Sequence, residues 1–198
     1  MNEDSLKTPI LIVISAPSGA GKTTLCRRLL QELQSEVVLS ISTTTRPPRK
    51  NEINGTDYHF INIDQFKNKI KNGDFIEWAE VHGQYYGTSK TFIEESFSLG
   101  QSVLLDIDVQ GAESFRNAFP DQTLSIFIAP PTLPELKCRL KGRGTDSDEE
   151  IEKRISNAKK EMKEAEKFDK IIINDNLENA YQEMLRLVTR RMKGIQSA

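Results

Sequence analysis

A loop of small, polar and basic residues follows the first apolar run of the chain and has the composition of a phosphate-binding loop. The stretch SAPSGAGKTT comes directly after ILIVI. Gly19 and Gly21 tolerate the unusual backbone angles that turn successive N–H groups toward an anion. Lys22 can reach the β- and γ-phosphates of a nucleoside triphosphate, and the hydroxyl of Thr23 can bind Mg²⁺. These spacings predict a P-loop, with Ala16 where such loops usually have glycine.

The helix expected after this loop begins beneath the bound phosphates. Its N-terminal N–H groups and the positive end of its dipole therefore add to the anion site. A P-loop alone indicates a nucleoside triphosphate and leaves the reaction open, because GTPases, motor ATPases and small-molecule kinases share it. The residues expected to bind the triphosphate are Ala16, Pro17, Ser18, Gly19, Ala20, Gly21, Lys22, Thr23 and Thr24.

A second cluster that could bind phosphate lies in the segment STTTRPPRKNEINGTDYHF. Arg46 and Arg49 stand three residues apart, with hydroxyl side chains before them and Tyr58 after them. Two guanidinium groups with hydroxyl donors suit a dianionic monophosphate, since arginine binds phosphate through two parallel hydrogen bonds. A solvated basic turn has the same composition, so the segment alone leaves both interpretations open.

Buried strands that alternate with helices are expected to position these groups. Short apolar runs rich in Ile and Val predict buried strands at 10–14, 102–108, 124–130 and 170–174. Helical patterns follow them from Thr23, at about 109–119, near 132–141 and at 177–192. The alternation predicts an α/β fold, in which a parallel sheet is flanked by helices and joined by right-handed crossovers.

Residues 43–90 interrupt this alternation. Their turn formers and the aromatic stretch FIEWAEVHGQYYG predict short antiparallel strands in a small insertion, which faces the carboxyl edge of the sheet. Farther along the chain, Ser147 and Glu150 have the spacing of a capping box that begins a charged helix.

The composition is that of an ordinary globular protein and argues against several functions. With 198 residues, 28% of them charged, and a formal net charge of −2, the chain as a whole does not attract nucleic acid or an anionic membrane. Cys26 and Cys138 lack the spacing of a metal site, and we expect both to be small core residues. The polar N-terminus lacks the features of a secretory signal, and no apolar run approaches the length of a membrane span. We therefore expect a cytoplasmic protein.

The spacing of the basic segment resembles the signature of the guanylate kinase family, whose members phosphorylate GMP from ATP. The matching pattern over residues 44–60 is T-T-R-x-x-R-x-x-E-x-x-G-x-x-Y-x-F. Further blocks follow the family order, namely SAPSGAGKTT, FIEWAEVHGQYYGT, LLDIDVQG, IAPP, RLKGRGT and IIIND, so that the resemblance spans residues 10 to about 192. The departures are Ala16 for the commoner glycine, Thr88 where some members have serine, and the polar first eight residues.

The resemblance implies a fold and a reaction. The fold is a single P-loop α/β domain with a core at about 9–42 and 91–198, a small mixed α/β GMP-binding insertion at about 43–90, and a helical lid at about 139–165. The reaction transfers the γ-phosphoryl group of ATP to GMP, giving ADP and GDP in purine nucleotide metabolism, with Mg²⁺ as cofactor. ATP and GMP are the expected partners. We expect no nucleic-acid partner and no membrane partner.

The resemblance also implies roles for particular residues of this chain. Ser42, Arg46, Arg49, Tyr58 and Tyr86 match the positions that hold the GMP phosphate, whereas Glu77, Thr88 and Asp106 match those around guanine. Arg139, Arg143 and Arg154 match lid arginines that close on ATP, and Asn174 with Asp175 matches the adenine-side turn. The catalytic set is then Lys22, Arg49, Arg143 and Arg154.

The chemistry of the substrates agrees with these roles. Guanine presents N1–H and an N2 amine on one edge, and the carboxylate of Glu77 can accept both hydrogen bonds, whereas adenine presents an acceptor at N1. Asp106 and Asp108 end a predicted strand, where a carboxylate can orient Mg²⁺; we assign the metal to Thr23 and Asp106, although either aspartate could instead cap the next helix.

The remaining polar and aromatic residues are expected to have structural roles. An anionic phosphate oxygen is already a nucleophile and needs no general base, so His59 and His82 should be surface or packing residues. Trp78 should lie in the core. The charged run at 149–167 should be mainly a solvated helix face, with Arg154 as the exception.

Two other functions fit parts of the pattern. A kinase for another nucleoside monophosphate would share the P-loop, but the complete arginine signature together with Glu77 argues against it. A catalytically inactive guanylate-kinase-like interaction module of scaffold proteins would be expected to lack an intact phosphate loop. Gly21, Lys22 and Thr23 are present here, which favours the enzyme.

Overall fold

A five-stranded parallel sheet forms the centre of the molecule. The computed structural model describes residues 8–81, 83–142, 144 and 146–194. Every pair of neighbouring strands in this sheet is parallel. The strand order is β2-β7-β1-β8-β9, with β1 (Leu11–Ser15), β2 (Val37–Leu39), β7 (Ser102–Asp106), β8 (Thr123–Ala129) and β9 (Lys170–Ile173). The α/β class predicted from the sequence is confirmed.

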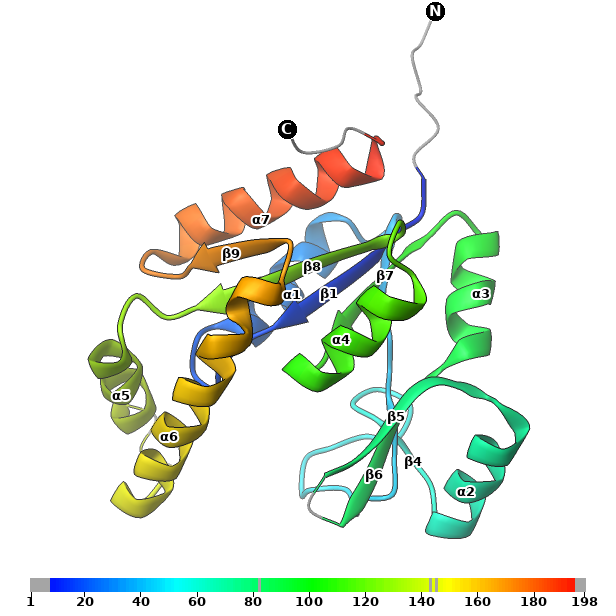
Figure 1. The fold of residues 1–198 in the computed structure, drawn as a ribbon, viewed down its shortest axis with the longest axis horizontal. Helices are drawn as coiled ribbons and strands as arrows, with labels where there is room; N and C mark the ends of the chain where they lie inside the picture. The colour runs from blue at the N-terminus through cyan, green and yellow to red at the C-terminus, as the bar shows by residue number, and fades with distance from the viewer. Residues whose placement is uncertain (1–7, 82, 143, 145, 195–198) are drawn as a thin grey trace, which may run out of the picture.

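Alternate residues of β1 build the two halves of the core. Ile12 and Ile14 pack in one apolar cluster with α1 (Lys22–Glu32) and α7 (Leu177–Met192). Leu11 and Val13 point to the other face, where they share a cluster with residues of α3 (Lys90–Ser98) and α4 (Val109–Ala118). Figure 1 shows α7 along one side of the sheet and α4 on the other. Because helices cover both faces, β1 is buried along its whole length.

The insertion forms a second, smaller sheet. Its strand order is β4-β3-β6-β5, with β3 (Thr43–Thr44), β4 (His59–Phe60), β5 (Phe75–Val81) and β6 (Gln84–Ser89), and α2 (Ile63–Asn72) lies beside it. The predicted antiparallel pairing is confirmed for β5 with β6 and for β3 with β6, whereas β3 and β4 are parallel. The fully buried ring of Phe66, from α2, stacks on Phe75 with their centroids 4.6 Å apart.

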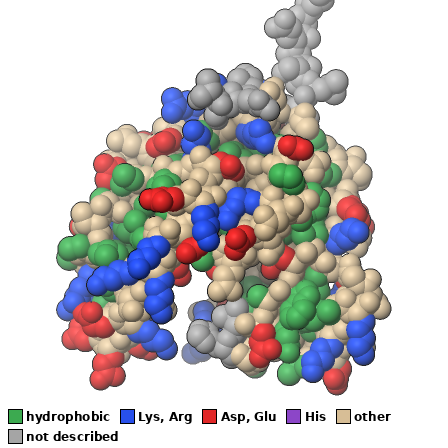
Figure 2. Space-filling view, in the orientation of Figure 1, with side chains coloured by type: hydrophobic (Ala, Val, Ile, Leu, Met, Phe, Trp, Pro, Cys, Tyr) green, Lys and Arg blue, Asp and Glu red, His purple; other side chains and the backbone are tan. Residues whose placement is uncertain are grey.

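Two further helices form an arm beside the sheet. In α5 (Leu133–Gly142) and α6 (Asp148–Glu164), the residues Leu136, Leu140, Ile151 and Ile155 share an apolar cluster of their own. The predicted capping box is confirmed, since the Ser147 side chain accepts from Glu150 N and the Glu150 carboxylate accepts from Ser147 N. The short helix η1 (Ala165–Lys167) leads from α6 to β9. Figure 2 shows the surface hollowed between this arm and the insertion.

Two packing predictions are wrong. Trp78 is 48% exposed, because the insertion is only a thin sheet with one helix and cannot enclose a ring of this size; it contacts Tyr85 at a centroid distance of 6.1 Å. Cys138 is exposed, since it lies on the side of α5 opposite to its apolar stripe. Cys26 is buried as expected, and burial raises the pKa of its thiol to about 12.

Local sequence patterns missed three elements. The strand β2 and the helices α2 and α3 were not predicted, and the strand predicted at 102–108 ends at Asp106. His59 is exposed as expected, whereas His82 lies outside the described residues. Across the part of the chain that the structure describes, no helix is long and apolar enough to cross a membrane.

The packing of Phe66 yields a test of the insertion. Phe66→Ala should lower the free energy of unfolding by about 3–5 kcal/mol, the usual cost of removing a buried ring from a packed site. Urea or thermal unfolding would measure the change. Ile53→Ala is the matched control in the same insertion, because Ile53 is 62% exposed and its loss should cost less than about 0.5 kcal/mol. A Phe66→Ala protein as stable as the control would contradict this account of the insertion core.

Candidate active site

The loop between β1 and α1 has the geometry of a phosphate cradle. Gly19 and Gly21 have φ values of 96° and 98°, which residues with a Cβ rarely adopt. Gly21 also stands at the N-cap of α1, where no side chain among the described residues caps the helix, so the first N–H groups are free to bind an anion. The loop residues from Ala16 to Thr24, except Ala20, line a cavity of about 390 Å³.

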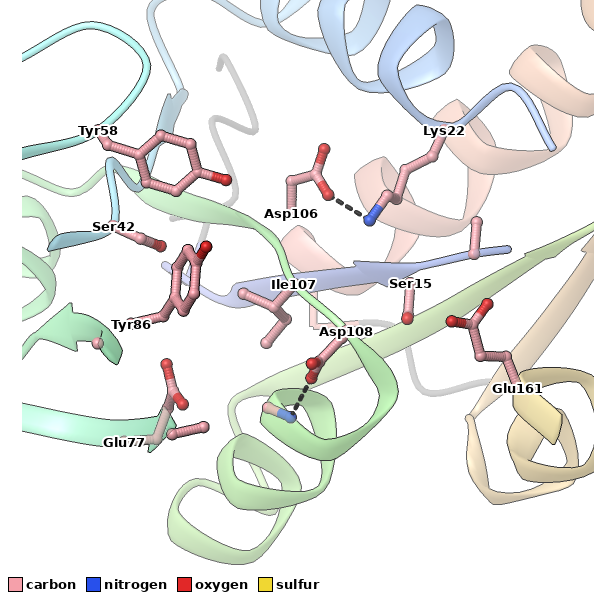
Figure 3. Close-up of a pocket in the computed structure, with 14 residues that line it drawn as sticks. Ser15, Lys22, Ser42, Tyr58, Glu77, Tyr86, Asp106, Ile107, Asp108 and Glu161 are labelled. Carbon is pink, nitrogen blue, oxygen red and sulfur yellow. Dashed lines mark hydrogen bonds and ion pairs between the residues drawn. The ribbon is translucent and has the colours of Figure 1, made fainter. Parts of the chain in front are cut away.

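Lys22 and Asp106 form an ion pair at the junction of two cavities. Their side chains are 21% and 35% exposed, and Figure 3 shows them joined at the carboxyl end of the sheet. The parallel register of β1 with β7 pairs Ile14 with Asp106, so the carboxylate lies next to the start of the loop. Both side chains line the loop cavity and also a neighbouring one of about 350 Å³.

The neighbouring cavity brings together most of the residues assigned to the acceptor nucleotide. Figure 3 shows Ser42, Tyr58, Tyr86 and Glu77 gathered on the side of the insertion, opposite Lys22. The rings of Tyr58 and Tyr86 meet edge to face, with centroids 6.1 Å apart. This cavity therefore has hydroxyl groups, one carboxylate from the insertion and one lysine from the P-loop on its walls.

Glu77 is a half-buried carboxylate held by Thr88. The two residues form a cross-strand pair between β5 and β6, and Thr88 Oγ1 donates to Glu77 Oε1 at 2.8 Å. Burial raises the pKa of Glu77 above its ordinary value, the hydrogen bond from Thr88 opposes that rise, and the charge of Asp108 adds to it. Thr88 itself is fully buried, and its hydrogen bond to Oε1 orients the Glu77 carboxylate.

The two arginines of the basic segment stand outside this cavity. Arg46 Nη1 and Nη2 donate to the two oxygens of Glu52 at 2.9 and 2.8 Å, and Glu52 also accepts from the backbone N–H of Arg49 at 2.7 Å. The hydrogen-bonded pair raises the pKa of Arg46 and lowers that of Glu52. Neither Arg46 nor Arg49 is among the described residues that line the cavity, and the side chain of Arg49 is exposed.

Of the three arginines expected in a lid, the structure describes two. Arg154 Nη1 donates to Ser18 Oγ at 2.7 Å, so α6 reaches the P-loop, and Nη2 donates to Asp146 at 3.0 Å. Arg139 donates from Nη2 to the carbonyl oxygen of Asn174 at 3.0 Å, which joins α5 to the end of β9. Arg143 lies outside the described residues.

The two residues expected at the adenine side have different environments. Asp175 is exposed, and its carboxylate accepts from the backbone N–H of Asn176 at 2.6 Å. Asn174 is only 4% exposed, and its side-chain amide donates to the carbonyl oxygen of Ala20 in the P-loop at 2.7 Å. Asn174 thus contacts the loop and is buried, whereas Asp175 is exposed and bonds to its own neighbour in the chain.

Thr23 and Asp106 carry oxygen atoms that fit Mg²⁺. Both line the P-loop cavity, and a hydroxyl and a carboxylate are the kind of ligand that Mg²⁺ prefers. Asp108 has another role, because its Oδ1 accepts from Gly111 N at 2.8 Å and caps α4. Within the described part of the chain, no group of three or more His, Cys, Asp or Glu side chains could hold a metal by itself. The residues therefore fit an ion bound largely by phosphate oxygens and water.

Sequence reasoning missed Glu161. This residue belongs to the charged run that was predicted to be mainly solvated, yet Figure 3 shows its carboxylate pointing into the cavity from α6. Burial raises the pKa of Glu161, the nearby Lys22 opposes that rise, and Asp108 adds to it. Its spacing was an available signal, because Glu161 follows Arg154 by seven residues and so shares a helix face with it.

Comparisons with known proteins agree with this geometry. The chain matches the family model described as guanylate kinase over residues 8–191. A protein named guanylate kinase from Dechloromonas aromatica is 51% identical over 180 residues, which cover 91% of this chain and 88% of that protein. Another with this name, from Fusobacterium nucleatum, is 45% identical over 92% of this chain and 97% of its own length. A crystal structure of guanylate kinase from Anaplasma phagocytophilum superposes with a TM-score of 0.76 at 31% identity, covering 96% of this chain and 89% of that chain.

The contact between Thr88 and Glu77 yields a prediction about titration. Because the hydrogen bond from Thr88 stabilises the ionised carboxylate, Thr88→Val should raise the pKa of Glu77 further above its wild-type value. Carboxyl ¹³C NMR titration of the protein would measure the midpoint. Thr88→Ser keeps the hydroxyl and should titrate like the wild type. A Thr88→Val midpoint at or below that of the wild type would show that the hydrogen bond does not control this carboxyl.

Proposed function

The chain belongs to the guanylate kinase family, and on that premise we propose which of its residues bind the donor ATP and which bind the acceptor GMP. The reaction of this nucleoside monophosphate kinase transfers the γ-phosphoryl group of ATP to GMP and gives ADP and GDP. The observation that carries our assignment is the wall shared by the two cavities, because Lys22 and Asp106 line both of them. Direct transfer requires the two phosphates to meet at such a boundary.

ATP is assigned to the P-loop cavity. The backbone N–H groups of the loop and of the first turn of α1 bind its β- and γ-phosphates, and Lys22 exchanges Asp106 for phosphate oxygens. Arg154 supports this role, since it already contacts Ser18 in the loop. Arg139 and Asp175 are assigned to the adenine end of the nucleotide. Arg143 is assigned to the lid by resemblance alone.

GMP is assigned to the neighbouring cavity, with guanine at Glu77 and Thr88. An ionised Glu77 accepts from guanine N1–H and N2–H, while Thr88 fixes the orientation of its carboxylate. The GMP phosphate is assigned to the hydroxyl groups of Ser42, Tyr58 and Tyr86 together with Arg46 and Arg49. Those arginines reach it by a movement of the insertion toward the core, which is a common response of kinases to substrate.

Catalysis in this proposal consists of positioning and neutralisation of charge. The acceptor is a phosphate oxygen that is already anionic, so the chain needs no general base. Arg49 holds the acceptor phosphate in line, while Lys22, Arg143 and Arg154 stabilise the charge on the transferred group. Mg²⁺, held by Thr23 and Asp106, would neutralise charge on the donor phosphates when bound. Kinases generally need such a divalent ion to use ATP, and Mg²⁺ is our proposal for it.

The cellular setting also remains a prediction. We expect the enzyme to act in purine nucleotide metabolism in the cytoplasm, where its nucleotide substrates occur, without a nucleic-acid or membrane partner. The formal net charge of −2 supports this expectation.

Removal of the P-loop lysine tests the donor site. Lys22→Ala should lower kcat by about 10²–10³-fold, which is the usual scale for loss of one preorganised charge-stabilising donor. The melting curve should be unchanged, because Lys22 is the first residue of α1 and its side chain is not part of the buried core. Lys67→Ala is the control, since Lys67 is an exposed lysine of α2 away from both cavities. Wild-type turnover in Lys22→Ala would refute the P-loop assignment.

Substitution of Glu77 tests the acceptor base. Glu77→Gln turns one acceptor oxygen into an NH₂ donor, so a guanine donor loses its partner. Because a mispaired buried polar group costs about 1–3 kcal/mol, kcat/KM for GMP should fall about 10- to 100-fold while KM for ATP hardly changes. The preference for GMP over AMP should also shrink, because the amide can donate to adenine N1. Glu80→Gln, at an exposed position of the same strand, is the control.

The acid limb of the pH profile provides a second readout of this assignment. Guanine binding requires the ionised form of Glu77, and burial raises the pKa of this carboxyl. The efficiency of the wild type with GMP should therefore decrease as the pH falls through that raised pKa. This decrease should be absent from Glu77→Gln. If the variant keeps wild-type efficiency, selectivity and pH profile, Glu77 does not bind guanine.

A further inference from the structure

Asn174 links the end of β9 to the P-loop from beneath. Its backbone N–H donates to the carbonyl oxygen of Ala129 at 2.8 Å, so it continues the pairing of β9 with β8. Its side-chain Nδ2 donates at 2.7 Å to the carbonyl oxygen of Ala20, a residue 154 positions earlier in the chain. The residue is 4% exposed. One N–H of the amide is therefore already used by the P-loop, and the buried residue has little surface left to meet a nucleotide base.

This hydrogen bond controls the orientation of one peptide group. In a trans peptide the C=O and the following N–H point in opposite directions. When the carbonyl of Ala20 points to Asn174, the N–H of Gly21 must point away from Asn174. Gly21 lines the P-loop cavity, whereas Asn174 is not among the described residues that line it. The side of this peptide group that faces away from Asn174 is therefore the side of the cavity. The contact thus directs a backbone N–H toward the position of the phosphates.

The same amide also explains why residue 21 is glycine. A Cβ built on Gly21 would lie 2.2 Å from Asn174 Nδ2, well inside the contact distance, and the φ of 98° would strain any other residue as well. The carbonyl oxygen of Asn174 accepts from Arg139 of α5 at 3.0 Å. Asn174 therefore stands between the P-loop on one side and the helix that leads into the lid on the other.

We propose that Asn174 is a positioning residue, which acts on the donor phosphates through the carbonyl of Ala20 and is not a contact for adenine. The proposal rests on the assignment of ATP to the P-loop. It predicts that loss of the amide weakens binding of any triphosphate by the same factor, whatever the base. A contact to adenine would instead affect only ligands that contain adenine.

Binding of three ligands to Asn174→Ala separates these two roles. The ligands are β,γ-methylene ATP, its uridine counterpart and inorganic tripolyphosphate, each titrated calorimetrically with Mg²⁺ and with GMP filling the acceptor site. We expect all three dissociation constants to rise together by about 5- to 10-fold, which corresponds to loss of one hydrogen bond. Asp175→Ala is the contrasting variant and should weaken only the adenine ligand. Weakening of the adenine ligand alone in Asn174→Ala would overturn the proposal.

Asn174→Asp tests the same contact in a side chain of equal size. Its carboxylate oxygen would face the carbonyl of Ala20 and repel it, whereas the protonated acid could donate as the amide does. Tripolyphosphate binding, expressed relative to the wild type at each pH, should therefore recover as the pH is lowered through the pKa of this buried acid. A ratio that does not change with pH would overturn the proposal. This variant also carries the test if Asn174→Ala fails to fold.

If the Asn174 variants do not behave as expected, Lys22→Ala shows whether the donor-site assignment or the role of Asn174 is wrong. If Lys22→Ala binds tripolyphosphate as the wild type does, ATP is not bound by the P-loop and the assignment of the donor site falls. If Lys22→Ala is weakened while both Asn174 variants bind normally, the donor site stands and only the role of Asn174 is refuted.

Discussion

The parallel register of β1 with β7 is the constraint on which the rest of the site depends. It sets Ile14 opposite Asp106, so the carboxylate that ends β7 lies beside the loop that leaves β1. Lys22, the first residue of α1, then pairs with this carboxylate at the boundary of two cavities. Because β1 is buried on both faces, neither strand can shift without exposing apolar side chains. The core therefore fixes the backbone positions from which Lys22 and Asp106 reach the boundary.

The two cavities that we assign to the nucleotides rest on supports of different stiffness. The P-loop joins a buried strand to a helix that packs in the main core. The acceptor cavity relies on a thin insertion, whose described centre is the stack of Phe66 on Phe75. Arg46 is held by Glu52 outside the cavity, while Arg154 on α6 already contacts Ser18 in the loop after β1. A rigid proposed donor site lies beside two less supported elements, the insertion and the arm of α5 and α6. This arrangement suits a reaction in which closure brings charged groups to the phosphates and excludes water.

Sequence patterns predicted best where local geometry decides the outcome. The four strands predicted for the main sheet and the capping box at Ser147 depend on residues close together in the chain, and the structure confirms them. The glycines of the loop between β1 and α1 likewise have the positive φ values expected of them. Trp78 and Cys138 were misjudged, because hydrophobicity alone does not show whether a second layer will cover a side chain. Glu161 was missed for the opposite reason. Its signal was the seven-residue spacing from Arg154, because a charge on a charged helix does not by itself show which face the helix turns toward the phosphate loop.

The sequence by itself determined the class of fold and the family, and it supplied the types of side chain that we assign to the two nucleotides. These follow from short spacings and from a long signature, in which each position is recognisable by residue type. Only the tertiary structure decided that Asp106 pairs with Lys22 while Asp108 caps a helix, and that the amide of Asn174 holds the carbonyl of Ala20. The two aspartates have the same side chain, so only their positions in the fold separate their roles. For Asn174 the physical reason is that every residue has a backbone carbonyl. A contact to one carries no mark in the sequence, and the fold alone selects which carbonyl lies within reach.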